Sequence, residues 1–434
     1  MDVTVASDSP SCTARLSRAG ALWALLIIVL ANFFNYLDRQ LVSAVEHDLT
    51  SDLGLTSGQY GLLWSLFTVG YLLCAVPIGY LADRASRTRL FAFCVFVWSI
   101  ATVASGWAET KSVLYVARLL IGVGEAGCLV IGPSLISDYF SVGVRGRALS
   151  LFYLGLPLGG TAAFILAGLW LGESPPPGRW RTLFYLAGFP GFLIALLIWL
   201  LPEPSRGQSA GAPGHESGRF RDYLPLLKTR TLLLIIVAQA CAVFFLVPLI
   251  HFGVKFFEQS RGMRPDQARI ALGLIALVAG GLGTAASGII GDLLARRYRG
   301  AYSLMAAIGY WASWPCLLIG FHSKEPAIFL PAVTLGAFFI FMCMPAVNTQ
   351  IANVTRSDQR SKAWALAVFI LHFLGDMVSP PLFGVLEGHM SRQAVFTMFS
   401  SSLILAGLCS FLAIFSARRD ELGTLALDSA SKDT

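Results

Sequence analysis

The chain has 434 residues, of which 56% are hydrophobic and only 13% are charged. With a mean hydropathy of +0.68, it is too apolar for an ordinary water-soluble globule. The formal net charge is +7, but the basic residues are spread over segments between apolar runs. They do not form the soluble basic face that nucleic-acid binding requires, so no nucleic-acid partner is expected. The composition predicts an all-α protein that crosses a membrane several times.

Twelve apolar runs are long enough to cross a bilayer as helices. A spanning helix needs about 20 apolar residues, because its backbone polar groups must be hydrogen-bonded within the segment. The first run lacks a small-residue cleavage pattern, so we expect it to remain in the mature protein. The expected helices cover residues 21–45, 59–82, 89–109, 112–138, 147–171, 180–201, 231–257, 266–291, 301–321, 327–354, 362–386 and 393–417.

The charges between these runs predict the orientation. If both termini are cytoplasmic, most of the 32 Lys and Arg residues lie on the cytoplasmic side, as the positive-inside rule requires. We therefore expect an integral multi-pass protein of a bacterial inner membrane. Residues 202–230 are polar and rich in Pro, Gly and Ser, which is typical of a linker. The expected parts are a cytoplasmic tail (1–20), a six-helix domain (21–201), a cytoplasmic linker (202–230), a second six-helix domain (231–417) and a cytoplasmic tail (418–434).

Two short motifs recur in the second half of the chain. Residues 79–84 (GYLADR), after the second expected helix, are matched by residues 288–293 (GIIGDL) after the eighth. Residues 145–148 (RGRA) are matched by residues 360–363 (RSKA). These two matches indicate that each half is one copy of a six-helix unit, which is a parallel-repeat plan found in transporters.

The first of these motifs carries a family resemblance. Residues 79–89 (GYLADRASRTR) resemble the loop signature between helices 2 and 3 of the major facilitator superfamily, although Ser86 and Thr88 depart from it. The resemblance implies a major facilitator fold, with twelve transmembrane helices in two pseudo-symmetric halves. It also implies a gating role for four residues at this loop, namely Gly79, Asp83, Arg84 and Arg87.

Within the superfamily, the chain most resembles the Spinster branch, whose animal members carry lysophospholipids and sphingosine phosphate. The resemblance rests on residues 35–39 (NYLDR), 118–126 (RLLIGVGEA) and 372–381 (HFLGDMVSPP). It implies a secondary transporter that works by alternating access on an amphipathic anionic lipid. Organic-anion branches of the superfamily share the first motif, so a small organic anion, such as a sugar acid or carboxylate, is the alternative substrate.

Four ionisable residues fall inside expected spans: Asp38, Arg39, Arg118 and Glu125. A charge in the hydrocarbon region costs several kcal/mol unless it faces a partner or water, so these residues are functional candidates. Arg118 and Glu125 are seven residues apart and lie about 10 Å apart along one helix face, too far to pair with each other. The sequence therefore predicts a charge network between helices, with partners on the first helix.

This network suits proton coupling. Burial raises the pKa of a carboxyl group and a nearby arginine lowers it, so small changes in access can load or release a proton. Glu125 is the first candidate for the proton carrier, because Gly122, Gly124 and Gly127 around it permit close helix approach. Asp38 is the second. The alternative is a permanent ion-pair cluster with a purely structural role.

Other polar residues are candidates for substrate binding. The planar guanidinium of Arg118 could clamp a phosphate or carboxylate. Arg39, which we place nearer the outer end of its helix, is expected to form an outer gate pair. His372 and Asp376 are four residues apart on one helix face and could form a pair, or His372 could simply hydrogen-bond within the bundle. The aromatic helix over residues 231–257 could line an apolar chamber.

Other classes of function lack support in the sequence. The six histidines are not spaced as metal ligands, and no nucleophile is paired with a base, so we expect no metal, no cofactor and no enzymatic activity. Selectivity-filter and receptor-domain patterns are likewise not evident. The expected partners are a small amphipathic or anionic substrate, protons and membrane lipids, acting on a monomer.

Overall fold

A computed structural model describes residues 17–204, 226–297, 300–356 and 359–430. Most of the expected N-terminal tail, the centre of the linker and the last four residues lie outside these ranges. Twelve helices in the described part are long and apolar enough to cross a membrane, the first at Ala19–Ala44 and the last at Arg392–Leu422. Each overlaps one of the twelve expected runs. The protein is therefore an all-α, multi-pass membrane protein, as predicted.

The N-terminal half contains six spans, the fifth of which is formed by α6 and α7 together, and one short extra helix, α2. Pro residues inside three of its helices are tolerated, because packed neighbours compensate for the lost backbone hydrogen bonds. Its elements are α1 (Arg18–Ala44), α2 (Glu46–Leu53), α3 (Ser57–Ala82), α4 (Arg87–Trp107), α5 (Lys111–Tyr139), α6 (Val142–Tyr153), α7 (Gly155–Leu171) and α8 (Arg181–Trp199).

The C-terminal half repeats this plan with more interruptions. A π-helical turn, Leu371–Asp376, separates two α-helices of the eleventh span. The other elements are α9 (Arg230–Arg261), α10 (Pro265–Ala295), α11 (Ala301–His322), α12 (Pro326–Asn353), α13 (Arg360–Ile370), α14 (Ser379–Glu387), α15 (Arg392–Ser400) and α16 (Ser402–Ala430).

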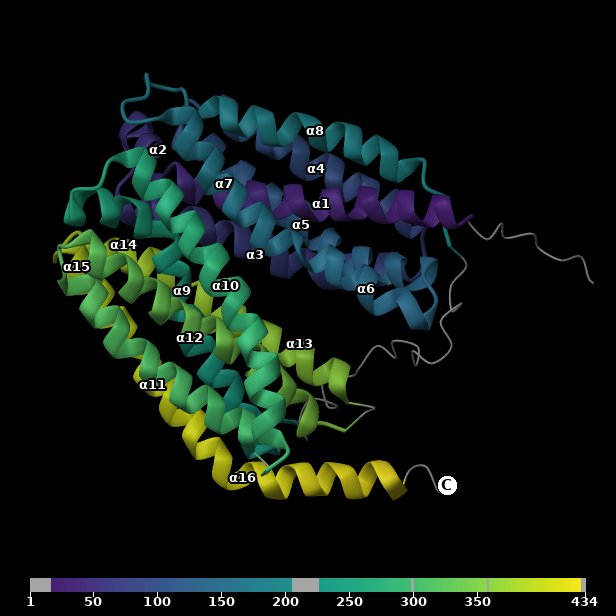
Figure 1. Cartoon of the computed structure of the whole chain (residues 1–434). Helices are drawn as coiled ribbons and strands as arrows, with labels where there is room; N and C mark the ends of the chain where they lie inside the picture. The colour runs from purple at the N-terminus through teal and green to yellow at the C-terminus, as the bar shows by residue number, and fades with distance from the viewer. Residues whose placement is uncertain (1–16, 205–225, 298–299, 357–358, 431–434) are drawn as a thin grey trace, which may run out of the picture.

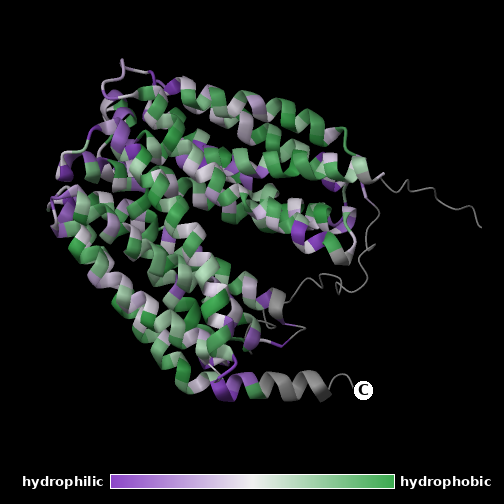
Figure 2. Ribbon diagram, in the orientation of Figure 1, coloured by the Kyte–Doolittle hydropathy of each residue, from purple (hydrophilic) through white to green (hydrophobic). Residues whose placement is uncertain are grey.

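The two halves meet at one end of the molecule and diverge toward the other (Figure 1). At the first end, which we call the α2 end, α3 packs against α14 and α7 packs against α10. At the opposite end, which we call the terminal end because α1 begins there, α6 and α13 lie well apart (Figure 1). Hydrophobic residues dominate the spans, and hydrophilic residues gather at the two ends (Figure 2). The two halves therefore pack against each other at the α2 end and separate toward the terminal end.

Glycines bring the helices together where the halves and the spans pack most closely. A side chain at Gly122 or Gly124 would collide with the backbone of α3 or α4, respectively, so the predicted close approach is confirmed. Between the halves, a side chain at Gly61 of α3 would collide with the backbone at Pro380 of α14. The α2 end is therefore closed by direct backbone-to-backbone packing.

Three features differ from the sequence expectation. Helix α2 was not predicted, because its eight residues include four acidic or imidazole side chains and are too few to form a span. The eleventh span breaks over the π-helical turn, before Pro380 and Pro381, which lie in the first turn of α14, where proline is favoured. Helix α16 does not end near 417 but continues to Ala430.

Most of the large aromatic side chains of the seventh span pack into the protein core. Phe245, Phe252, Phe256 and Phe257 of α9 are buried. Phe256 and Phe252 contact rings of the neighbouring helices, and the ring centres of Phe252 and Phe383 are 4.5 Å apart. These side chains fill the core of the C-terminal half, since packed aromatic rings bury large apolar areas.

Candidate functional site

The centre of the N-terminal half contains an ion pair between the first and fourth spans. The Arg39 Nη2 atom of α1 lies 2.8 Å from the Glu125 Oε2 atom of α5, and Arg39 Nε donates to the same oxygen at 3.0 Å. Glu125 is fully buried. The Arg39 guanidinium also lies within 6 Å of the ring centres of Tyr36, Phe67 and Tyr71. This aromatic cage supports the cation by cation–π contacts.

The second acid of α1 has different partners. Asp38 Oδ2 accepts a hydrogen bond of 2.6 Å from the Thr102 hydroxyl of α4. Its other oxygen is 3.9 Å from Arg118 Nη2 of α5, which is too long for a hydrogen bond. Asp38 and Arg39 are neighbours in sequence, and successive helical residues point about 100° apart. They therefore interact with different residues of α5, and the predicted network between helices is present.

Arg118 has donors that the described residues leave unused. Its side chain is 3% exposed, and neither Nε nor Nη2 has a hydrogen-bond partner in the described part of the chain. Its guanidinium lies 5.5 Å from the Phe184 ring centre, and it interacts electrostatically with His251 of α9. Buried guanidinium donors normally have acceptors. Arg118 can accordingly provide two N–H donors to an anionic group close to where the halves meet.

A histidine–aspartate pair lies in the C-terminal half, across the interface from Arg39. His372 Nδ1 is 2.7 Å from Asp376 Oδ2 within the π-helical turn, so the predicted i to i+4 pairing is observed. The ring of Tyr71 lies 5.8 Å from the His372 ring and 5.6 Å from the Arg39 guanidinium. Tyr71 thus connects the Arg39–Glu125 pair to the His372–Asp376 pair. The structure brings all six predicted network residues into one region.

The α2 end is closed by two buried ion pairs between the halves. Arg269 of α10 is 1% exposed and donates to Asp48 Oδ2 at 2.7 Å and to the Ala44 carbonyl at 3.1 Å. Arg392 of α15 lies 3.1 Å from Glu46 Oε1. Burial raises the pKa of both Glu46 and Asp48, although the arginines oppose this effect. Two acids of α2 are therefore held by arginines of the other half.

These pairs correct the expectation for Arg39. It was expected to form an outer gate pair, but its partner is Glu125 in the same half, and Tyr36, Phe67 and Tyr71 surround it. The contacts that close the α2 end come instead from Asp48–Arg269, Glu46–Arg392 and a hydrogen bond between Ser43 and His251. Gly122 lets α5 pack closely against α3, whose Phe67 and Tyr71 rings surround the Arg39 guanidinium.

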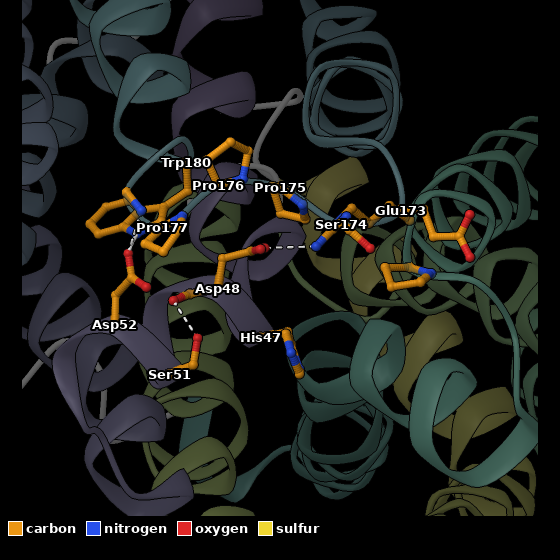
Figure 3. Close-up of a pocket in the computed structure, with 13 residues that line it drawn as sticks. His47, Asp48, Ser51, Asp52, Glu173, Ser174, Pro175, Pro176, Pro177 and Trp180 are labelled. Carbon is orange, nitrogen blue, oxygen red and sulfur yellow. Dashed lines mark hydrogen bonds and ion pairs between the residues drawn. The ribbon is translucent and has the colours of Figure 1, made fainter.

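A cavity of about 320 Å³ lies beside these pairs at the α2 end. Figure 3 shows His47 and Asp48 of α2 on one side of it, and Pro175, Pro176 and Pro177 on another. Asp52 accepts hydrogen bonds from the Trp180 indole at 2.8 Å and from the Gly178 amide at 2.7 Å. This cavity therefore belongs to the closed α2 end and is separate from the central charge network.

The predicted gating residues lie at the terminal end. Asp83 follows the last turn of α3 and is exposed, and the Arg84 guanidinium lies 3.5 Å from the Tyr80 ring centre. Arg87 pairs with Asp138 at 2.5 Å and with Glu203 at 2.8 Å. Within the described residues, no hydrogen bond or ion pair joins Gly79, Asp83, Arg84 or Arg87 to the C-terminal half.

The Arg87 cluster joins the loops of its own half at the terminal end. Glu203, just after α8, accepts hydrogen bonds from the Thr88 amide at 2.9 Å and from Arg87. Burial raises the pKa of Glu203, but these hydrogen bonds lower it more, so its pKa lies below the usual value. The cluster joins the start of α4, the end of α5 and the segment after α8, all within the N-terminal half.

Several of these residues were not predicted from the sequence. Tyr71, Thr102 and His251 lie in apolar spans, and nothing in their spacing distinguishes them from ordinary core residues. Arg269 and Arg392 lie near the starts of their spans, where basic residues normally face water. The useful signal was a short acidic segment directly after the first span, matched by arginines near the starts of two spans of the other half.

The comparisons with known proteins agree with this architecture. Residues 28–380 match the Major Facilitator Superfamily model. The chain therefore belongs to the major facilitator superfamily, and it is a membrane transporter by class. Within this superfamily it is similar to Spinster proteins: it is 28% identical over 388 residues to protein spinster of Drosophila melanogaster, with 86% of this chain and 63% of that protein covered. It is 27% identical to protein spinster homolog 3 of Homo sapiens, with 92% and 84% covered.

Solved structures show the same fold. A bacterial homolog to the human lysosomal transporter Spinster, in an inward-facing and unoccupied conformation, matches with a TM-score of 0.86 at 21% identity, covering 93% of this chain and 99% of that chain. A D-xylose-proton symporter matches with a TM-score of 0.73 at 15% identity, covering 91% and 98%. The chain spans less than two thirds of the Drosophila relative, at 63% of its length.

Proposed function

We propose that the protein carries an amphipathic anionic lipid, such as a lysophospholipid or sphingosine phosphate, across the membrane by proton-coupled alternating access. The observation that carries this proposal is Arg118, a buried arginine with two unused N–H donors near the interface of the halves. A guanidinium keeps its charge when desolvated and matches the oxygens of a phosphate. Arg118 would bind the headgroup.

The surroundings of the charges favour an amphipathic substrate over a wholly polar one. The Phe184 ring lies beside Arg118, and aromatic rings surround Arg39. The similarity to Spinster proteins supports the same class of substrate. A small organic anion, such as a sugar acid, is the competing substrate and would need polar groups for its hydroxyls, which apolar rings do not provide.

Proton coupling would use the acids of the same network. In the conformation described here Glu125 binds Arg39, and one Glu125 oxygen has no hydrogen-bond partner in the described part of the chain. Protonation of Glu125 would release Arg39 to the rings of Tyr71 and Phe67. Asp38 would be the second proton site, and the His372–Asp376 pair would pass the change to the C-terminal half through Tyr71.

The two closed pairs at the α2 end fit one state of an alternating-access cycle. By the positive-inside rule, the terminal end faces the cytoplasm, with both termini, and the α2 end faces outward. We propose a bacterial inner membrane as the location and a monomer as the working unit. The described conformation would then be open to the cytoplasm and closed outside, with Asp48–Arg269 and Glu46–Arg392 as the outer closure.

Flux into proteoliposomes tests the proposal. The purified protein is reconstituted, and uptake of lysophospholipid, sphingosine phosphate and a sugar acid is measured with and without an inward proton gradient. We expect uptake of a lipid substrate that the gradient accelerates and a protonophore abolishes. Gradient-driven uptake of the sugar acid alone would replace the lipid proposal with the organic-anion one. Lipid uptake at the same rate with and without the gradient would contradict proton coupling.

A further inference from the structure

A groove of about 390 Å³ lies on the membrane-facing surface between α4 and α8, away from the charge network. Its floor consists of two small, buried side chains, Ala92 and Ala195. Its walls are larger apolar side chains that reach into the surrounding membrane, among them Phe96, Phe192 and Leu196. The centres of the Phe96 and Phe192 rings are 5.7 Å apart. Small floor residues between bulky walls form an apolar groove that is open to the side.

The position of the groove determines what can fill it. Helices α4 and α8 lie side by side on the face of the N-terminal half that points away from the other half (Figure 1), and this face is hydrophobic (Figure 2). Both helices are membrane spans, and the walls are open to the side, with Phe93 60% exposed. Lipid chains surround a span at this depth. An acyl chain is therefore the natural occupant.

A cation lies at the terminal end of the groove. Arg89, in the first turn of α4, is exposed, and its guanidinium lies 5.7 Å from the ring centre of Trp199, which lines the groove. No carboxylate pairs with Arg89 among the residues that the structure describes. Stacking on an indole face leaves the edge of the guanidinium free to bind phosphate oxygens. Tryptophan and arginine are also the residues that mark the headgroup level of a membrane.

We propose that this groove binds one anionic glycerophospholipid of the cytoplasmic leaflet, with an acyl chain over Ala92 and Ala195 and its phosphate on Arg89. Basic sites between spans on the cytoplasmic side are a recognised way to bind anionic headgroups. The bound lipid would support α4 and α8 from outside. The site does not depend on the transported substrate, because Arg118 and Glu125 lie on the opposite side of α4 from these walls, within the helix bundle.

Native mass spectrometry of the purified full chain tests this site. Phosphatidylglycerol and phosphatidylcholine with identical acyl chains are titrated onto the wild type, Arg89→Gln, Leu196→Trp and the control Arg296→Gln. Arg296 is an exposed arginine at the same end of the bundle, after α10, and is not part of the groove. Thermal unfolding confirms that each variant is folded.

We expect one phosphatidylglycerol to bind the wild type in preference to phosphatidylcholine. Arg89→Gln should weaken this binding about fivefold, since one basic residue near a membrane surface contributes about 1 kcal/mol toward anionic lipid. Leu196→Trp should reduce the binding of both lipids by filling the groove, and Arg296→Gln should bind as the wild type does. Unchanged lipid preference in Arg89→Gln, or unchanged binding in Leu196→Trp, would overturn the proposal.

Discussion

Arg39 lies 2.8 Å from Glu125, although the two residues are 86 positions apart in the chain. Asp38, directly beside Arg39, lies instead near Arg118 and bonds to Thr102. Each arginine of the network is thus matched with an acid on another span. Because breaking a buried pair leaves an uncompensated charge, the protonation state of either acid will be coupled to the position of its arginine.

Replacing Glu125 tests the proton-carrier role. Glutamine keeps the size of the side chain and an oxygen that can accept from Arg39, but it cannot titrate. Glu125→Gln should therefore abolish the acceleration of substrate uptake by a proton gradient while the protein remains folded. Uptake in proteoliposomes at several external pH values measures this. The control is Glu109→Gln, at an exposed site after α4, and wild-type pH dependence in Glu125→Gln would assign the role elsewhere.

Replacing Arg118 separates headgroup binding from a structural role. Lysine keeps the charge but loses the planar fork, so Arg118→Lys should bind lysophospholipid at least about tenfold more weakly, the equivalent of one charged hydrogen bond. If Arg118 only neutralises Asp38, lysine should nearly suffice, and Arg118→Ala should lower thermal stability as much as binding. Titration of lysophospholipid, sphingosine phosphate and a sugar acid, with melting curves as the control, distinguishes the cases. Normal lipid binding by Arg118→Ala would remove Arg118 from the site.

The pairs at the α2 end should control outward opening. Asp48→Asn leaves Arg269 buried without a charged partner, which costs about 3–5 kcal/mol in the closed arrangement. The population should shift toward a state open at the α2 end. Double electron–electron resonance measures the shift as a change in the distance between two spin labels, one on each half at the α2 end.

Arg264 provides a matched control for this experiment. It pairs with Glu173 across the same interface, but both side chains are about half exposed, at 52% and 57%. An exposed pair of this kind contributes about 0–1 kcal/mol. Arg264→Gln should therefore leave the distances nearly unchanged. Equal shifts in both variants, or none in Asp48→Asn, would contradict the outer closure.

The loop after α3 is predicted to hold the terminal end closed in the opposite state. Asp83 is exposed here, and no hydrogen bond or ion pair joins it to the C-terminal half within the described residues. Asp83→Ala should therefore leave the described conformation intact and weaken the alternative one. The population should move further toward the state open at the terminal end, by at most the few kcal/mol that such contacts supply. Distances across the terminal end test this, and an unchanged distribution would remove Asp83 from the gate.

The sequence alone determined the spans, their number and the division into halves. Backbone polar groups have no water to bind in hydrocarbon, so each crossing must be a long apolar helix, and such helices are visible in one dimension. Asp38, Arg39, Arg118 and Glu125 were identifiable for the same reason, because isolated charges in such helices are rare. The pair of His372 and Asp376 followed from helical spacing, which is a local property.

Only the tertiary structure decided which charges meet. Whether Arg39 pairs with Glu125 or with a gate depends on how closely α1 approaches α5, and that distance depends on glycine contacts between several helices. The closure by Asp48 and Arg269 joins residues 221 positions apart. The position of Tyr71 between Arg39 and His372 likewise depends on how the helices pack. Pairing across a bundle depends on the rotation and depth of each helix. Packing against neighbouring helices determines both, and the hydropathy of a single segment does not encode them.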